Sequence, residues 1–482
     1  MQESIAHKTA RTTLWSAIER ISTLSVQFII TMVLARLLTP SDYGTIAMLT
    51  IFIAIAQQFV ECGIANALIR KIECTQDDYS TAFFFNIGLS CVVYVLLYLI
   101  APFVARFYDM EILTSVLRVY GISVIFQSFK IVQYAILCKK LEFKKMAKVT
   151  AVVTLVSGLF GVMLAYWGYG VWALVAQNVL LAFLTSVAYF IVLRWKPSFI
   201  FSMDSLQYLW GFGSKMLASG IISVVYTNVY SLVIGKIYDS KSLGIFNNGH
   251  RLSHFYPDII KSIFVRNSLP ILSELQNDNA RLLSVYREFI VLVSFLTFPI
   301  VMILFVIAKP FILFFLTEKW AECIIYLQIF CVSSLLMPAN WINLNLLQAL
   351  GRSDLTLKAE IIKKGLGITL IFSVMRFGPL VLAICYSLFD IVVYGINLYF
   401  AKKLTGLSIK AQVIDMSSSF ISSLLSAIVA YCALLLVDNY FIQMILATTI
   451  GIITYFCATK YLFRMNIYVK LRELTKWNQK EK

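Results

Sequence analysis

Charged residues are the first thing this 482-residue sequence lacks: they make up 14% of it, against about 25% in an ordinary soluble domain. Hydrophobic residues account for 60%. Long polar segments are scarce too, and the longest connection between apolar runs lies at about 266–286. A water-soluble fold does not need so much apolar surface, and the composition therefore indicates a protein embedded in a lipid bilayer.

Motifs of several enzyme classes are also absent. The sequence has no GxxxxGK[ST], since GFGSK at 211–215 lacks the spacing, and it has no HExxH or GxSxG. Its nine cysteines are scattered, without a CxxC pair, and are interpreted as free thiols. His250 and His254 have metal-ligand spacing, but no third ligand accompanies them. We therefore expect no enzymatic activity, no cofactor and no metal.

The apolar residues gather in runs of the length that crosses a membrane, roughly 20 residues. Fourteen runs are predicted, at 14–36, 43–64, 81–104, 112–137, 148–167, 170–193, 208–235, 245–265, 287–308, 322–347, 356–376, 379–401, 414–437 and 440–462. The first follows a polar start without a cleavage site, and it is interpreted as a retained helix. The predicted fold is an all-α membrane protein with about 14 transmembrane helices.

The positive charge is distributed unevenly along these spans. The formal net charge is +16, a value that could suggest a nucleic-acid partner. However, most lysines and arginines fall in the tails and the even-numbered connections. The odd-numbered connections hold few: Arg106, Lys236, Lys241, Lys309, Lys319 and Arg376. This asymmetry predicts that both termini are cytoplasmic and that membrane lipids, not nucleic acids, are the neighbours of the basic residues.

One polar connection occurs twice, 200 residues apart. Residues 35–47 read ARLLTPSDYGTIA, and residues 235–247 read GKIYDSKSLGIFN. The matched pairs are Arg36 with Lys236, Asp42 with Ser242, and Gly44 with Gly244. An internal duplication explains the match, and similar turn chemistry in unrelated connections is the alternative. Six spans separate the copies, so both enter the membrane in the same direction, as in parallel repeats.

The duplication predicts two pseudo-symmetric lobes of six helices and two added helices. We place the lobes at 1–203 and 204–408, and the added helices with a basic tail at 409–482. Two lobes with the same orientation around a central cleft suit transport by alternating access.

Polar residues within the spans are the candidates for function, because charges inside a membrane are costly and usually face a cavity or a polar partner. The eighth span has the clearest stripe, with intervals of four and three residues: Asn247, Arg251, His254, Asp258 and Lys261. The first span carries Arg20 on a similar stripe, with Glu19 beside it. Further candidates are Glu61, Lys130, Lys215, Asn343 and Asp390.

Two interpretations compete for these residues. Cations outnumber carboxylates on the stripes, and that excess predicts an anionic ligand such as a pyrophosphate, bound by Arg20, Lys130, Lys215, Arg251 and Lys261. Asn343 and its aromatic neighbours suit a sugar. Alternatively, Arg20, Lys215, Arg118, Lys363 and Lys364 extend to the membrane surface. For Arg251, Asp258 and Lys261 the alternative is a purely structural ion network.

The motifs also resemble a known family. The run LARLLTPSDYGTIAMLTIFIAI, the following GIANALIRK, and IGKIYDSKSLGIFNNGHRL in the second lobe are similar to those of the Wzx-type polysaccharide flippases. These belong to the multidrug/oligosaccharidyl-lipid/polysaccharide exporter superfamily, and the colanic-acid and teichuronic-acid branch is the most similar. The resemblance covers most of the chain.

The resemblance implies export of undecaprenyl-pyrophosphate-linked oligosaccharide units across the bacterial inner membrane, driven by an ion gradient of H⁺ or Na⁺, with contact to polysaccharide polymerase machinery. It also implies an acidic residue near the middle of the seventh span. This chain has Tyr230 beside Asn228 there. Ion coupling would then fall to Glu19, Glu61, Asp258 or Asp390. A small-molecule or drug antiporter of the same superfamily and a membrane enzyme of polysaccharide synthesis are the alternative functions.

Overall fold

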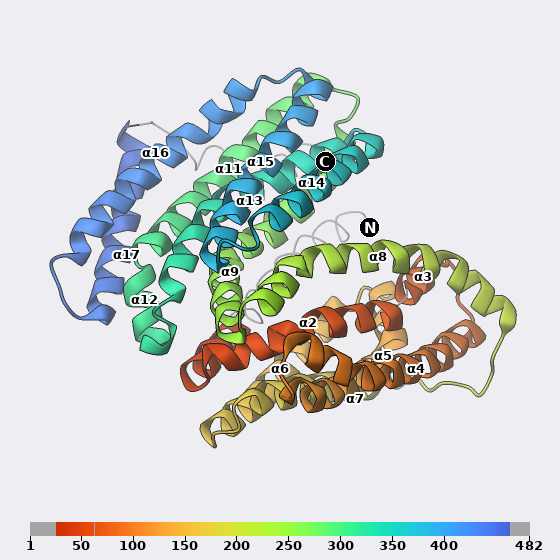
Figure 1. Ribbon diagram of the computed structural model, residues 1–482. Coiled ribbons are helices and arrows are strands. Elements are labelled where there is room, and N and C mark those ends of the chain that lie inside the picture. The colour runs from red at the N-terminus through yellow and green to blue at the C-terminus, as the bar shows by residue number, and fades with distance from the viewer. Residues whose placement is uncertain (1–25, 62, 463–482) are drawn as a thin grey trace. The chain divides into compact units, whose positions relative to one another are not determined.

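The computed structural model describes residues 26–61 and 63–462, and within these ranges the regular secondary structure is helical throughout (Figure 1). The chain divides into two compact units, Met1–Gly244 and Ile245–Lys482. Each unit is described by itself. The predicted all-α membrane fold is confirmed, because the described part holds eleven helices long and apolar enough to cross a membrane.

The described part of the first unit consists of a short apolar helix and seven further helices. Their bounds are Val26–Leu37, α2 Pro40–Glu61, α3 Ile64–Arg70, α4 Gln76–Tyr108, α5 Ile112–Lys139, α6 Phe143–Tyr166, α7 Val171–Leu193 and α8 Met203–Ile237. Helix α5 packs against α4 and α7, and α6 packs against α7. Helix α8 lies along α2, α3 and α4, and these contacts place it in the first unit.

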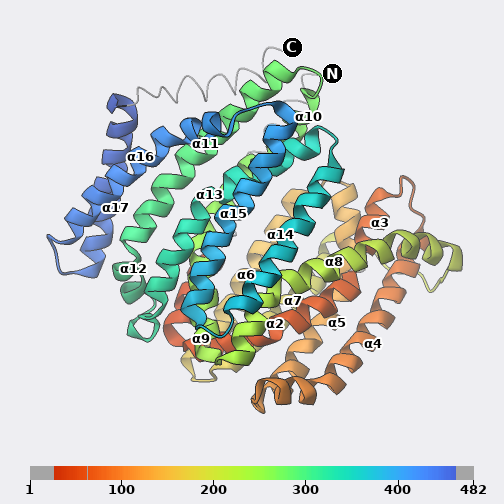
Figure 2. The same cartoon turned by 45° about the horizontal axis from the view of Figure 1, so that its top comes forward.

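The second unit begins within a helix, five residues after the helix starts. Its elements are α9 Ser240–Ile260, a π-helical turn Lys261–Val265, α10 Arg266–Glu274, α11 Asn279–Val306, α12 Ala308–Phe315, a 3-10 turn Glu318–Trp320, α13 Cys323–Ala349, α14 Ser353–Val374, α15 Pro379–Thr405, α16 Ile409–Leu434, α17 Tyr440–Cys457 and a π-helical turn Ala458–Leu462. Helices α11, α13 and α15 run side by side (Figures 1 and 2), and α16 packs against α11 and α17.

Polar caps explain where several of these helices begin. The Thr75 side chain accepts a hydrogen bond from the Asp78 amide, and the Asp78 side chain accepts one from the Thr75 amide, so the two form a capping box that starts α4. Asp278 caps α11 and Ser408 caps α16 in the simpler way. Gly406, with a φ of 72°, ends α15 in the left-handed conformation.

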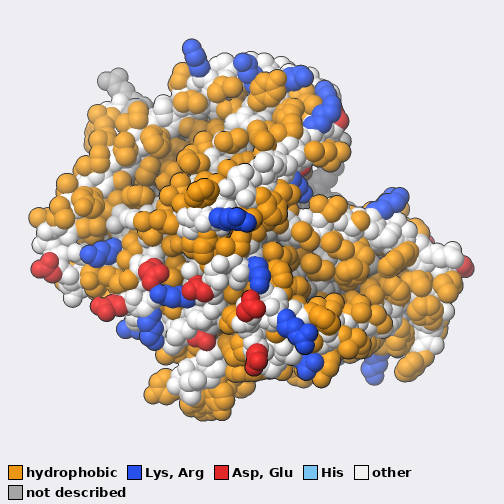
Figure 3. Space-filling view, in the orientation of Figure 1, with side chains coloured by type: hydrophobic (Ala, Val, Ile, Leu, Met, Phe, Trp, Pro, Cys, Tyr) orange, Lys and Arg blue, Asp and Glu red, His pale blue; other side chains and the backbone are white. Residues whose placement is uncertain are grey.

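The predicted spans and the observed helices agree closely. Three predicted spans are not among the eleven apolar helices. The span 14–36 lies largely outside the described residues. The spans 245–265 and 356–376 form the helices α9 and α14. Helix α14 carries five charged side chains, and α9 carries three together with two asparagines and two histidines. The count of fourteen spans therefore stays a prediction, as do the lobe boundaries at 203 and 408. Figure 3 shows that hydrophobic side chains cover most of the visible surface, as expected for helices that face lipid.

The 200-residue offset recurs in the helix boundaries. The helix Val26–Leu37 ends at residue 37 and α8 ends at Ile237, while α2 begins at Pro40 and α9 begins at Ser240. The two copies also touch. A Cβ on Gly44 would lie 1.6 Å from the carbonyl oxygen of Ser240, and a Cβ on Gly244 would lie 1.9 Å from that of Pro40. The hydroxyls of Ser41 and Ser240 are 2.7 Å apart. The repeated glycines thus let the two helix starts cross in close contact.

Candidate functional site

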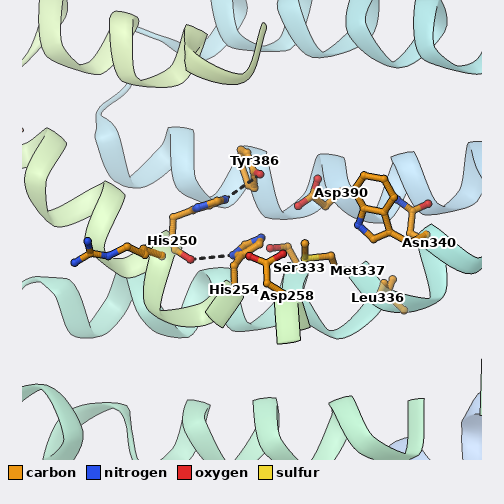
Figure 4. A pocket seen from close by; sticks show the side chains of 11 residues that line it. His250, His254, Asp258, Ser333, Leu336, Met337, Asn340, Tyr386 and Asp390 are labelled. Atoms are coloured by element: carbon orange, nitrogen blue, oxygen red, sulfur yellow. Dashed lines mark hydrogen bonds between the residues drawn. The ribbon is translucent and has the colours of Figure 1, made fainter. Parts of the chain in front are cut away.

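The second unit contains a pocket of about 440 Å³ between α9, α13 and α15 (Figure 4). Most of its lining side chains are polar or charged. They are His250, Arg251, His254 and Asp258 from α9, Ser333, Leu336, Met337, Asn340 and Trp341 from α13, and Tyr386 and Asp390 from α15. The pocket therefore brings the polar stripe of α9 to face two neighbouring helices.

Helix α9 approaches α13 closely because residue 249 is glycine. A Cβ at Gly249 would lie 2.8 Å from the Cβ of Tyr326 and 3.1 Å from the amide nitrogen of Leu327. Next to it, the ring of Phe246 packs edge-on against Phe330, with 5.0 Å between the centroids. This apolar contact fixes the start of α9 and directs the following polar turn toward the pocket.

The two histidines lie one helical turn apart and stack, with 3.9 Å between the ring centroids. The His250 Nε2 is 3.0 Å from the Tyr386 hydroxyl, and the His254 Nδ1 is 2.9 Å from the His250 carbonyl oxygen (Figure 4). Because a carbonyl only accepts, the hydrogen of neutral His254 is on Nδ1, and its Nε2 keeps a lone pair. The hydrogen bond between His250 and Tyr386 thus links α9 to α15.

The charged side chains of α9 have separate partners. The Arg251 Nη2 donates to the Asn248 Oδ1 at 2.6 Å. The ammonium of Lys261 lies over the ring of Trp341, 3.6 Å from its centroid, and also interacts electrostatically with Asp258. The lining of the pocket itself holds one arginine and two aspartates. This pocket carries both signs of charge, whereas the stripes alone predicted an excess of cations.

On the opposite wall, α15 contributes Tyr386 and Asp390, which are one helical turn apart. The Ser333 hydroxyl of α13 donates to the Phe330 carbonyl oxygen at 3.0 Å and lies beside the Asp390 carboxylate. The Asn340 Oδ1 accepts a hydrogen bond of 2.7 Å from the Asn397 side chain, so this oxygen is engaged with α15 rather than open to the pocket. Asp390 is thus a partly buried carboxylate on the cavity wall.

The structure brings together three of the predicted site residues, Arg251, Asp258 and Asp390, and places Lys261 beside them on Trp341. It does not bring Asn343 to the pocket. That residue is fully buried, and its Oδ1 accepts hydrogen bonds from the Tyr286 hydroxyl at 2.5 Å and from Gln412 at 3.0 Å. Its predicted sugar contact finds no place in this pocket.

The remaining predicted residues belong to the first unit. Glu61 at the end of α2 and Lys130 in α5 interact electrostatically with each other, and Lys215 is exposed on α8. Glu19 and Arg20 lie outside the described residues. The role of each of these five residues stays a prediction.

Sequence reasoning singled out Asn343 and its neighbours in α13 but missed Ser333, which lines the pocket from the same helix. The signal was present, since Ser333, Met337, Asn340 and Trp341 follow a helical spacing on one face. This spacing is a weak signal for a polar site because two of the four side chains are apolar. Among residues 26–61 and 63–462, no group of three or more metal-ligating side chains comes together, so the histidine pair has no third ligand there.

Comparison with known proteins gives the family. The chain is 26% identical over 444 residues to the lipopolysaccharide biosynthesis protein WzxC of Escherichia coli (strain K12), covering 89% of this chain and 88% of that protein. It is 22% identical over 435 residues to the teichuronic acid biosynthesis protein TuaB of Bacillus subtilis (strain 168), covering 89% of each.

Among solved structures, it is similar in fold to the lipid II flippase MurJ in an inward closed conformation. The TM-score is 0.76 at 16% identity, and the match covers 94% of this chain and 99% of that one. Residues 33–325, more than half of the chain, match the family model described as "Polysaccharide biosynthesis protein". The predicted resemblance is therefore confirmed, and the chain belongs to the polysaccharide biosynthesis protein family.

Proposed function

We propose that this protein is a flippase that moves lipid-linked oligosaccharide units across the bacterial inner membrane by alternating access. The observation that carries the proposal is the polar pocket of the second unit, in a multi-pass membrane chain of the polysaccharide biosynthesis protein family. Intramembrane charges around a cavity are typical of a transport site. A flippase moves its substrate from one leaflet to the other without making or breaking a covalent bond. This agrees with the absence of hydrolase and ATPase motifs from the sequence.

The names of the relatives agree with a cell-surface polysaccharide as the end product. WzxC is named for lipopolysaccharide biosynthesis, TuaB for teichuronic acid biosynthesis and MurJ for flipping lipid II. For this chain we propose an undecaprenyl-pyrophosphate carrier, cytoplasmic termini and contact with the polymerase machinery that uses the flipped units. The distribution of lysine and arginine supports the orientation.

We assign the pyrophosphate to the basic residues of the predicted stripes. Arg251 lines the pocket of the second unit, and Lys215 is exposed on α8 in the first unit. A guanidinium binds a phosphate group through two parallel hydrogen bonds, and an ammonium acts as a mobile point charge. Arg20, Lys130 and Lys261 complete the proposed set. The anionic carrier would compensate the positive charges of these five side chains when it binds.

A drug antiporter of the same superfamily is the second candidate function. One observation favours it, since the pocket lining holds two aspartates, Asp258 and Asp390, against a single arginine. Such a lining also suits a cationic substrate. A cell that produces the protein would then resist cationic drugs, whereas a flippase would leave drug sensitivity unchanged and restore surface polysaccharide.

Replacing Arg251 or Lys215 by alanine tests the proposed function. We expect each variant to lower surface polysaccharide at least ~10-fold in a cell that lacks its own flippase, because one charge-assisted contact is worth about 1.5–3 kcal/mol. The matched controls are Arg352→Ala and Lys145→Ala, which remove cations paired with acidic neighbours outside the pocket. Full polysaccharide from both test variants, at normal protein level, would contradict the proposed binding of the pyrophosphate.

A further inference from the structure

The second unit holds another pocket where α11 and α16 begin, and we call it the α11–α16 pocket. Its volume is about 370 Å³. The lining comes from one face of α11, from the turn before α16 and from α16 itself: Ala280, Leu283, Ser284, Arg287, Glu288, Val291, Leu407 and Asp415. It shares no lining residue with the pocket between α9, α13 and α15. The proposed transport site therefore does not account for it.

The charged part of the α11–α16 pocket lies where two apolar spans begin. Arg287 is the first residue of the predicted span 287–308, and Asp415 is the second residue of the predicted span 414–437. Both spans follow even-numbered connections, which the distribution of lysine and arginine assigns to the cytoplasmic side. Side chains at the start of a span lie at the depth of the phospholipid headgroups. The pocket is thus placed to meet a headgroup of the cytoplasmic leaflet.

An ion pair forms one wall of this pocket and joins α11 to α16, which pack together (Figure 2). The Arg287 Nε and Nη2 donate to the two Asp415 carboxylate oxygens at 2.8 and 2.7 Å. The Asp415 side chain is only 11% exposed, whereas the Arg287 side chain is 46% exposed. A guanidinium has five N–H groups, and the pair uses two of them. The exposed part of Arg287 can therefore donate to a phosphate while the pair stays intact.

Glu288 adds a second carboxylate to the lining. Two carboxylates and one guanidinium line the pocket, so it carries both signs of charge with one negative charge in excess. A ligand that matches such a lining has a phosphate for Arg287 and, close to it, a cation with N–H donors for Glu288. A purely anionic headgroup would be repelled by the two carboxylates. The lining therefore suits a zwitterion better than an anion.

We propose that the α11–α16 pocket binds the headgroup of phosphatidylethanolamine, with the phosphate on Arg287 and the primary ammonium on Glu288. Asp415 stays paired with Arg287 and holds the guanidinium in position. In this headgroup the phosphate and the ammonium are two carbons apart, so both can be bound in one pocket. One bound lipid then contacts α11 of the predicted second lobe and α16 of the two added helices, and it stabilises their packing.

Two related headgroups distinguish this site from a general affinity for lipids. Phosphatidylcholine keeps the phosphate and the positive charge, but its three methyl groups leave no N–H donor for a carboxylate. Phosphatidylglycerol keeps the phosphate and has no positive charge. We expect phosphatidylethanolamine to bind at least ~10-fold more tightly than either, because a hydrogen bond between charged groups is worth about that factor.

Native mass spectrometry of the full-length protein in detergent, titrated with the three lipids at equal acyl-chain length, tests the proposal. Glu288→Gln should abolish the preference for phosphatidylethanolamine over phosphatidylcholine, because the amide has no negative charge for the ammonium. Ala280→Phe should do the same by filling the pocket from an exposed position on α11. Asp354→Asn is the matched control, since Asp354 forms a similar two-bond pair with Arg352 outside the pocket.

The possible results decide between the sources of the ligand as well. A preference that is unchanged in Glu288→Gln, or in Ala280→Phe if Glu288→Gln does not fold, would overturn the site. Tighter binding of phosphatidylglycerol than of phosphatidylethanolamine to the unaltered protein would also overturn it. Displacement of the lipid by an equal concentration of soluble glycerophosphoethanolamine would overturn the lipid assignment in favour of a soluble ligand. No oligosaccharide is present in these experiments, so their outcome does not depend on the flippase proposal.

Discussion

Replacing Gly44 by alanine is expected to disrupt the crossing of α2 and α9 and to abolish function. The new Cβ would lie 1.6 Å from the Ser240 carbonyl oxygen, far closer than any tolerated contact, and a backbone atom cannot turn aside as a side chain can. Overpacking costs typically 1–3 kcal/mol, and we expect about 3 kcal/mol or more here. This outweighs the gain of about 1 kcal/mol that alanine brings to a helix. The apparent melting temperature in detergent and the restored surface polysaccharide would measure the effect.

The chain offers a matched control for this substitution. Gly88 lies within α4, and a Cβ there would have no neighbour within 4 Å, so Gly88→Ala should be neutral or slightly stabilising. Gly244→Ala should behave like Gly44→Ala, since its Cβ would lie 1.9 Å from the Pro40 carbonyl oxygen. Equal melting temperatures for Gly44→Ala and Gly88→Ala would contradict the close crossing seen in the structure.

The sequence predicted the fold class well because membrane helices are specified by long apolar runs, which are a local signal. The repeat was also detectable, since the same turn chemistry begins α2 and α9. The sequence did not show why glycine is needed at both copies of the repeat. The match of Gly44 with Gly244 indicated a duplication, while the structure shows that each glycine also makes room for a carbonyl group of the other copy.

The candidate site was predictable only along single helices. The stripe of α9 identified Arg251, His254 and Asp258 from their helical spacing, and all three line the pocket. The partnership of His250 with Tyr386 depends on how α15 packs beside α9, and spacing within one helix carries no information about that. The same limit explains why His250 was considered only as a metal ligand.

Asn343 shows the same limit. The sequence grouped Asn343 with its aromatic neighbours as side chains that suit a sugar, but residues two apart in a helix lie on nearly opposite sides. Trp341 therefore faces the pocket, while Asn343 turns toward α11 and α16 and joins Tyr286 and Gln412 in a buried hydrogen-bonded network. Such a network stabilises the packing of α13 within the second unit.

The carboxylate of Asp78 joins three segments of the first unit. It is 1% exposed and accepts hydrogen bonds from the Lys71 ammonium at 2.6 and 2.7 Å, from the Thr75 amide at 2.9 Å and from the Ser205 hydroxyl at 2.7 Å. Lys71 precedes α4, Thr75 caps it, and Ser205 belongs to the first turn of α8. One buried charge therefore holds the starts of two long helices together.

Asp78→Ala should accordingly destabilise the first unit more than the replacement of an exposed side chain does. The substitution removes the helix cap and leaves the Lys71 ammonium without its carboxylate, and we expect a loss of about 2–3 kcal/mol, reduced because Lys71 is partly exposed. The apparent melting temperature in detergent should fall by about 5 °C or more. Asp77→Ala, which removes the adjacent carboxylate in the same first turn, is the control and should change it little. Equal melting temperatures for Asp78→Ala and Asp77→Ala would contradict the role of this buried carboxylate in joining the two helix starts.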